Sequence, residues 1–408
     1  MSKVVERFLK YVSFDTQSAE DTGKYPSTDK QLVLAKYLVD ELKELGLQNV
    51  ELDKYGYVTG EIPANIDKKV PVVAFISHMD TSPEVSGANV KPQIVKNYDG
   101  KDIILNKEQN IVLSTEIYSD IKQFVGEDII TTDGTTLLGA DDKAGIAEIV
   151  TGIEYLLSHP EIKHGVVKVA FTPDEEVGAG TDYFDVKKFG ADFAFTFDGS
   201  EPGEFVYETF NAAGATVTIK GNNVHTGSAK GKMVNAIFIA QEFISLLPEN
   251  ERPENTEGYE GFYHVDAISG DVSEIKIQYL IRDFDRKSFE QRKQFIKSLE
   301  NKVNEKYGEG TVTVEVKDQY SNMREVIEKY PHIIEIGKEA IKAVGLELKV
   351  QPIRGGTDGA RLSFEGLPTP NIFAGGMNFH SKYEYVAISA LEKATEVVVK
   401  IAELVAEK

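Results

Sequence analysis

Three short apolar runs in this chain end in histidine or acidic residues, and this arrangement constrains the fold more than any other feature. The runs are residues 70–77, 166–172 and 191–197, and they lead into His78-Met79-Asp80, Asp174-Glu175-Glu176 and Asp198. Functional side chains collect just past the carboxyl ends of the strands in an open α/β sheet. We therefore expect these side chains to share one sheet edge, where imidazole and carboxylate ligands would suit a metal such as zinc.

Strand and helix patterns alternate on both sides of a central segment. Helices are predicted for residues 2–12, 28–46, 143–158, 323–343 and 388–406, and strands for 49–62, 70–77, 166–172 and 192–197. This alternation predicts an α/β layered sheet. Residues 81–135 lack such a pattern, and we expect them to form a long, irregular, turn-rich excursion.

The pattern of the central segment predicts an inserted domain. Strands are expected at 205–220, 273–283 and 311–317, and helices at 235–247 and 287–307. This run of strands and helices resembles a ferredoxin-like α+β sandwich. The expected organisation is one α/β domain formed by residues 1–207 and 320–408, interrupted by a smaller α+β domain at 208–319.

Composition excludes several classes of function. The net charge of −21 argues against nucleic-acid partners and against attraction to anionic membranes. The absence of cysteine excludes disulfides, a thiolate metal site and a cysteine nucleophile. The N-terminus is charged and amphipathic, and no segment approaches the ~18–20 apolar residues that a membrane span needs. We therefore expect a cytoplasmic protein.

Two motifs can each direct a ligand to one site. His78 and Asp80 are two residues apart at a strand end, so their side chains can point the same way. In Gly139-Ala140-Asp141-Asp142-Lys143-Ala144-Gly145, the glycines allow a tight turn before a helix. Asp142 could simply cap that helix, whereas Asp141 is free to bridge two ions.

The adjacent acids of Asp174-Glu175-Glu176 allow two interpretations. Neighbouring carboxylates raise each other's pKa unless a cation compensates, although the segment could also be an ordinary solvated turn. In the functional interpretation one glutamate binds metal, while the other stays free to take a proton from an activated water. The residue pattern alone does not say which glutamate does which. Asp198, at another strand end, and His380, in a glycine-rich segment, add candidate ligands.

Together these motifs resemble the M20 family of dinuclear zinc peptidases, and within it the tripeptide aminopeptidases. The resemblance covers nearly the whole chain and rests on segments in matching order and spacing, at residues 78–87, 139–145, 172–178, 197–203, 223–236, 354–361 and 378–384. It implies a zinc-peptidase-like catalytic domain, with a mixed sheet flanked by helices, and a smaller lid domain. It also implies an enzyme that removes the N-terminal residue from tripeptides, with short peptides bearing a free N-terminus as its partners.

The resemblance further implies two zinc ions per subunit. One zinc would be held by His78 and Asp198, the other by Glu176 and His380, and Asp141 would bridge them. Glu175 would be the catalytic base, Asp80 would orient the His78 ring, and His225 would stabilise the oxyanion. The alternative for His225 is a polar turn residue.

A tripeptidase must also recognise a free C-terminal carboxylate, for which we select Arg282 and Arg354. The planar guanidinium group of arginine can donate two parallel hydrogen bonds to a carboxylate, which the ammonium group of lysine cannot do. Arg282 could instead form a surface ion pair with Asp283 or Asp285. Asn235 could line the site or cap its helix. The resemblance implies a homodimer formed through the inserted domain.

Two competing functions stay open at this stage. Another M20 hydrolase, a deacylase or carboxypeptidase acting on N-acyl amino acids, would use the same metals and the same Glu175. A metal-binding or peptide-binding protein could keep the ligands without turnover, although such a protein would usually have lost the base.

Overall fold

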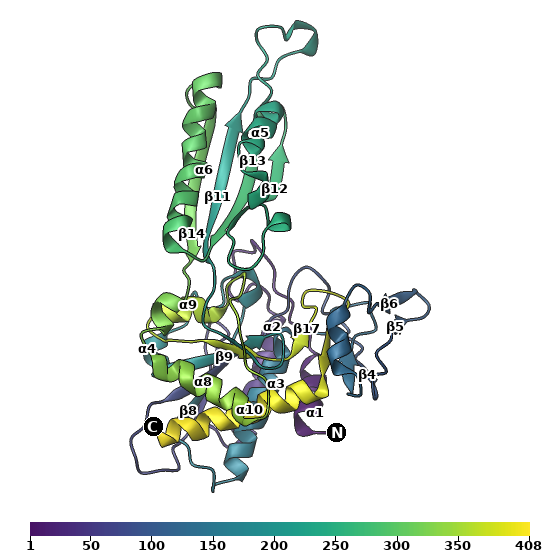
Figure 1. Cartoon of the computed structure of the whole chain (residues 1–408), viewed down its shortest axis with the longest axis vertical. Helices are drawn as coiled ribbons and strands as arrows, with labels where there is room; N and C mark the ends of the chain where they lie inside the picture. Colours follow the sequence, from purple (N-terminus) through teal and green to yellow (C-terminus); the bar gives the residue numbers. More distant parts are fainter. The chain divides into compact units, whose positions relative to one another are not determined.

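The computed structural model describes residues 1–408, which form two compact units (Figure 1). Unit 1 comprises Met1–Tyr207, Glu325–Gln351 and Thr357–Lys408. Unit 2 comprises Glu208–Arg324 together with the short segment Pro352–Gly356. Unit 2 therefore extends a few residues past the expected boundary at 319 and takes a second piece from the C-terminal part of the chain.

An eight-stranded mixed sheet forms the centre of unit 1, as the sequence predicts. Its strands, in spatial order, are β1 (Gln48–Leu52), β2 (Val58–Ile62), β8 (Val167–Thr172), β3 (Val73–His78), β9 (Phe193–Gly199), β16 (Asn371–Phe373), β10 (Glu204–Val206) and β15 (Lys349–Val350). The four strands β8, β3, β9 and β16 are parallel to one another. Strand β3 is buried at every position, as expected for a parallel strand covered on both faces.

Unit 1 also contains helices, several of which pack directly on this sheet. The helices are α1 (Lys3–Tyr11), α2 (Gln31–Leu45), α3 (Ala140–Ser158), α4 (Val186–Phe189), α7 (Arg324–Ile327, which begins at the last residue of unit 2), α8 (Pro331–Ala343), α9 (Asp358–Phe364) and α10 (Ile388–Glu407). The predicted helix 323–343 is wrong in one respect, because the structure has two helices, α7 and α8, separated by a short non-helical segment. Pro331 starts α8, and the residue before a proline disfavours the helical conformation.

Glu148, on α3, is 0% exposed, and neither of its carboxylate oxygens has a hydrogen-bond partner. Burial raises the pKa of Glu148 well above its ordinary value, and the Asp142 carboxylate adds to the shift. When the pKa of a carboxyl group is higher in the folded than in the unfolded protein, the folded protein is most stable below the unfolded pKa. It loses stability as pH rises from the unfolded pKa to the folded pKa. Glu148→Gln should therefore stabilise the protein by roughly 1–3 kcal/mol at a pH of about 8, and by less at a pH of about 5. Thermal unfolding of both proteins at the two pH values measures this, and a difference independent of pH would contradict it.

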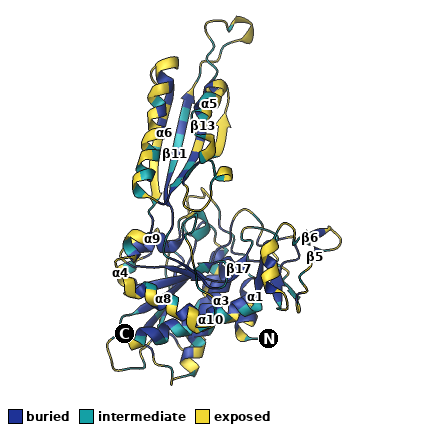
Figure 2. Ribbon diagram, viewed as in Figure 1, coloured by how far each residue is buried: buried dark blue, intermediate teal, exposed yellow.

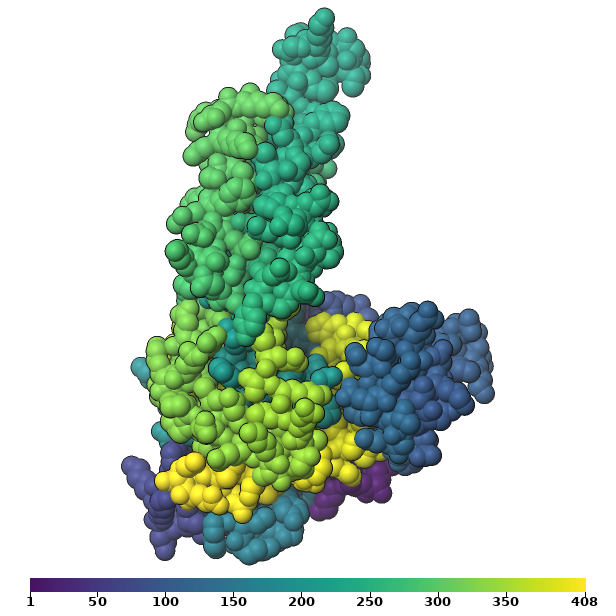
Figure 3. All heavy atoms as spheres, viewed as in Figure 1, coloured from purple at the N-terminus to yellow at the C-terminus, as the bar shows by residue number.

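The segment 81–135 contains regular strands, although an irregular, turn-rich excursion was expected. It contains β4 (Gln93–Val95), β5 (Ile103–Asn106), β6 (Ile111–Leu113), the 3₁₀ helix η1 (Ser119–Phe124) and β7 (Ile129–Thr131). Strands β4 and β7 join β17 (Gly376–Met377) and β18 (Tyr385–Ala387) in a second sheet. An apolar cluster of its own, which includes Tyr98, Leu113, Ile121 and Tyr385, holds this lobe, and Figure 3 shows it in blue at one side of unit 1. Strands of three or four residues are too short to show a clear period.

Unit 2 is the predicted ferredoxin-like sandwich. It contains β11 (Asn211–Lys220), α5 (Ala236–Ser245), β12 (Phe262–Gly270), β13 (Glu274–Asp283), α6 (Arg286–Tyr307) and β14 (Val312–Tyr320), with 3₁₀ turns η3 (Thr226–Ser228), η4 (Glu249–Glu251) and η5 (Pro253–Asn255). The antiparallel sheet has the order β12-β13-β11-β14, and residues alternate between buried and exposed along β13 (Figure 2). Sequence analysis missed β12, an edge strand whose second half is exposed and therefore carries no apolar alternation.

None of the helices is both long enough and apolar enough to cross a membrane.

Candidate metal centre

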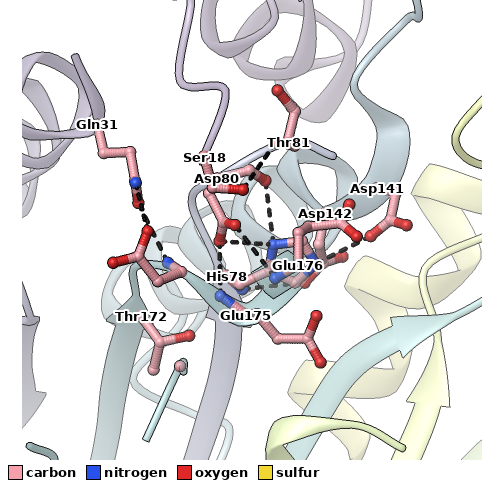
Figure 4. Close-up of polar contacts among 12 residues, drawn as sticks. Ser18, Gln31, His78, Asp80, Thr81, Asp141, Asp142, Thr172, Glu175 and Glu176 are labelled. Carbon is pink, nitrogen blue, oxygen red and sulfur yellow. Dashed lines mark hydrogen bonds and ion pairs between the residues drawn. The ribbon is translucent and has the colours of Figure 1, made fainter. Parts of the chain in front are cut away.

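Three parallel strands carry candidate ligands to one edge of the central sheet. His78, the last residue of β3, lies opposite Thr172, the last residue of β8. The turn after β8 supplies Glu175 and Glu176, and β9 supplies Asp198 near its end. The parallel neighbours β8, β3 and β9 thus bring residues from three distant parts of the sequence to one place (Figure 4).

Two groups of side chains lie close enough to hold metal ions. His78, Glu175 and Asp198 form one group, and His78, Asp141 and Glu176 form the other, with ligand atoms within 4.8 Å of one another in each. His78 Nε2 is 2.9 Å from Asp141 Oδ1 and 3.6 Å from Asp198 Oδ1. His78 is therefore surrounded by carboxylates on its Nε2 side.

His380 approaches from the C-terminal part of unit 1. Its Nε2 is 2.8 Å from Glu176 Oε2 and 3.2 Å from Asp141 Oδ2. The two oxygens of Asp141 therefore face different imidazoles, with Oδ1 toward His78 and Oδ2 toward His380. A carboxylate in this position can serve two ions at once.

The irregular start of α3 sets the position of Asp141. Gly139 has φ of 86°, and Asp141 and Asp142 depart from helical geometry, with a cis peptide bond between them. Asp142 was expected to be a possible cap of this helix, but its side chain does not cap it. Its Oδ2 accepts hydrogen bonds from Ser77 Oγ and from the His78 backbone N–H (3.2 Å), so it fastens the turn to the end of β3.

Asp80 holds two parts of the centre. His78 Nδ1 faces both the Asp80 carbonyl oxygen (3.1 Å) and Asp80 Oδ1 (3.3 Å). The same carboxylate accepts the backbone N–H groups of Glu175 (3.0 Å) and Glu176 (3.1 Å), and Asp80 is 0% exposed. It therefore orients the His78 ring and also fixes the turn that presents both glutamates (Figure 4).

Asp174 holds the same turn from its other side. It adopts a left-handed conformation with φ of 58°. Its carboxylate accepts hydrogen bonds from Ser27 N (2.6 Å), Ser27 Oγ and Gln31 Nε2 (2.7 Å). Asp174 is therefore a structural acid, although in sequence it resembles its two neighbours.

Sequence analysis missed two carboxylates near the centre. Glu84 Oε2 lies 2.6 Å from His380 Nδ1, so the second histidine also has a carboxylate partner. Glu384 is buried, and its oxygens accept backbone N–H groups from the turn before α3. Both residues lie within segments that carry the family resemblance, but only the folded structure shows what they contact.

The electrostatics of the centre fit a divalent cation. Burial raises the pKa of Glu176 to about 8, and the Asp141 carboxylate adds to this shift while the His380 ring opposes it. Burial also raises the pKa of Asp198 to about 6 and that of Glu175 well above its ordinary value. A cation among these carboxylates would favour their ionised forms. Glu176 Oε1 is buried without a hydrogen-bond partner, and the donor set of ring nitrogens and carboxylate oxygens suits zinc.

The four remaining candidate residues lie in unit 2. His225 Nδ1 accepts from Gly227 N (3.1 Å), and Asn235 Oδ1 accepts from Ile237 N (2.9 Å) and so caps α5. The roles of these two residues toward a substrate stay predictions.

The two arginines differ in how their donors are used. Arg282 donates from Nη1 to the carbonyl oxygens of Ala213 (3.1 Å) and Ile281 (3.0 Å). The alternative ion pair with Asp283 or Asp285 is absent. Asp283 is bound by Arg292 Nε (2.6 Å), and Asp285 accepts the backbone N–H group of Ser288 (2.8 Å). Arg354 donates from both Nη1 and Nη2 to the loop 256–260.

Comparisons with known proteins identify the family of this chain. A family model described as a peptidase dimerisation domain matches residues 207–311. Over 408 residues, all of both chains, the sequence is 61% identical to peptidase T of Caldanaerobacter subterraneus subsp. tengcongensis. It is 60% identical to peptidase T of Clostridium novyi over 404 residues, 99% of each chain.

Solved structures show the same fold. The aminopeptidase PepT from Bacillus cereus has a TM-score of 0.77 and 26% identity, covering 99% of this chain and 98% of that one. A tripeptidase from Staphylococcus aureus has a TM-score of 0.79 and 23% identity, covering 100% and 98%. A dinuclear metal-binding peptidase of the M20 family from Bacillus subtilis has a TM-score of 0.65 and 15% identity, covering 99% and 98%.

Proposed function

Because this chain belongs to the peptidase T family of M20 peptidases, we propose that it is a dizinc aminopeptidase that releases the N-terminal residue of tripeptides. The observation that carries the proposal is the gathering of two imidazoles and four carboxylates at one sheet edge. The competing deacylase and binding protein could share these side chains, so it is the 61% identity to peptidase T over the whole chain that favours the aminopeptidase.

The ligand positions suggest how two ions would be held. His78 and Asp198 would hold one ion, Glu176 and His380 the other, and Asp141 both. Ions bound in this way lower the pKa of a bound water and polarise the substrate carbonyl group.

Glu175 would act as the general base. Its side chain is grouped with His78 and Asp198, while its backbone is fixed by Asp80. In this role Glu175 takes the proton of the attacking water and delivers it to the leaving amine.

His225 would donate a hydrogen bond to the developing oxyanion. Its Nδ1 accepts from the Gly227 N–H group, so a neutral ring carries its proton on Nε2. Nε2 is therefore the donor that the proposed role requires.

Arg282 is the better candidate for binding the substrate's C-terminal carboxylate, since its two hydrogen bonds come from Nη1 alone and leave Nη2 and Nε for a ligand. Lysine lacks the planar guanidinium group. Arg282→Lys should lower kcat/KM for a tripeptide by roughly 10–100-fold, mainly through KM, and should hardly affect the C-terminally amidated tripeptide. Steady-state kinetics on both substrates measure the effect. Arg354→Lys is the matched control, and the same selective loss there instead would assign the carboxylate to Arg354.

The reaction itself is tested by product identity. The zinc-loaded protein is incubated with Leu-Gly-Gly, its N-acetyl form, a dipeptide and a tetrapeptide, with and without chelator, and products are identified by mass spectrometry. Chelator-sensitive release of leucine from the free tripeptide alone is expected. Cleavage of only the acetylated compound would move the function to a deacylase, and no turnover with metal bound would indicate a binding protein.

We also propose that the protein is a homodimer, supported by the match of residues 207–311 to a peptidase dimerisation domain. The mass of one chain is 45.2 kDa. Light scattering coupled to gel filtration should therefore give twice this mass, and a monomeric mass at micromolar concentration would contradict the proposal.

A further inference from the structure

A buried carboxylate, Glu384, joins the two chain segments that carry Asp141 and His380. Glu384 is 1% exposed. Its Oε2 accepts the backbone N–H groups of Leu138 (2.7 Å) and Gly139 (2.8 Å), and its Oε1 accepts that of Asp141 (3.0 Å). Both oxygens are therefore occupied by a single turn, the one that positions Asp141.

The Asp141 N–H group lies in the first turn of α3, where backbone donors have no partner within the helix, and the other two N–H groups belong to residues directly before the helix. The N-cap residue of the helix is Gly139, which has no side chain to accept a hydrogen bond. Glu384 supplies the missing acceptor from a position 246 residues after Leu138. Its negative charge is also favoured there, because hydrogen bonds to an ionised acceptor are stronger than neutral ones and the helix dipole is positive at this end.

On its own side, Glu384 is tied closely to His380. The intervening turn is closed by hydrogen bonds from Glu384 N to Ser381 O (3.3 Å) and from Tyr383 N to Ser381 Oγ (2.9 Å). Asn378 Nδ2 donates to Tyr383 O (3.1 Å), which closes the turn from the other side of His380. The position of Glu384 therefore determines that of the His380 backbone within narrow limits.

We propose that Glu384 is a positioning residue that sets Asp141 and His380 at the separation needed to share one metal ion. The inference rests on the proposed metal centre. Glu384 does not contact substrate in this role, because its carboxylate is buried and both oxygens are engaged. Glu384 holds the two turns in one relative position, and the 3.2 Å distance between Asp141 Oδ2 and His380 Nε2 depends on that position.

The test is the affinity of the full-length protein for Zn²⁺ alone, measured by competition with a chelator of known affinity. Glu384→Gln keeps the shape of the side chain but removes the charge that favours three N–H donors. The affinity of at least one zinc site should fall by roughly 10–100-fold, the range typical when the partner of a metal ligand is removed. At saturating zinc, kcat should fall while KM for the tripeptide changes little.

Asp192→Asn is the matched control. Asp192 Oδ2 accepts the backbone N–H of Val72 (2.7 Å), a bond of the same kind at the opposite end of the central sheet. This variant should bind zinc like the wild type. If Glu384→Gln does not fold, Glu384→Asp replaces it, since aspartate keeps the charge but is one methylene too short to reach all three donors.

Each outcome decides between the assignments. Weaker zinc binding in a Glu384 variant that folds like the wild type supports the positioning role. Wild-type zinc affinity in that variant overturns it, as does failure of both variants to fold, which would make Glu384 a determinant of the fold. If the wild-type protein itself binds no zinc, the metal centre fails instead, independently of Glu384.

Discussion

Replacing Glu175 by glutamine is expected to lower kcat by about 10²–10⁴-fold while zinc stays bound. Glutamine has the shape of glutamate but cannot accept the proton of the attacking water. The backbone of residue 175 would still be held by Asp80, so the turn should not move. Steady-state kinetics on a tripeptide, together with elemental analysis of dialysed protein, measure both quantities.

Glu176→Gln is the matched control for this prediction. Glu176 Oε2 lies 2.8 Å from His380 Nε2, and Glu176 Oε1 is buried without a partner, which is the setting of a metal ligand. This variant should lose zinc as well as activity. If Glu175→Gln lost zinc and Glu176→Gln kept it, the two roles would have to be exchanged.

The sequence predicts the position of the centre because strand ends are visible in a single chain. The runs before His78, Glu175 and Asp198 are mostly apolar, although Lys168 and Asp192 interrupt the second and third, and these runs form the parallel strands β3, β8 and β9. Once these strands are adjacent, their ends must meet. The assignment of the base to Glu175 came from family resemblance, because neighbouring glutamates look alike in sequence.

What the sequence could not predict depends on contacts between distant segments. Glu84 and Glu384 look like ordinary acids in turns, and their contacts with His380 and with the turn before α3 exist only after folding. The lobe of residues 81–135 was missed for a different reason. Its strand β7 pairs with β18 from the far end of the chain, and β4 pairs with β7. These strands are three residues long and therefore carry too little local pattern.

Replacing Asp141 by alanine is expected to remove most of the bound zinc and to lower kcat/KM by at least about 10³-fold. Asp141 Oδ1 is 2.9 Å from His78 Nε2, and Asp141 Oδ2 is 3.2 Å from His380 Nε2, so one side chain borders both halves of the centre. Its loss should therefore weaken both sites together. His380→Ala should weaken one site, because His78 and Asp198 would still be present for the other.

The zinc content of these variants after dialysis separates a bridging from a terminal ligand. Asp141→Asn controls for shape, since asparagine can still form hydrogen bonds with the two histidines but carries no charge to share between two cations. We expect it to fold, to bind both ions weakly and to be nearly inactive. If either Asp141 variant held one ion with wild-type affinity, Asp141 would be a ligand of the other ion alone. Two tightly bound ions in both variants would refute the bridging role of Asp141. A water molecule in place of the side chain would not bind two divalent cations as strongly as a buried carboxylate does.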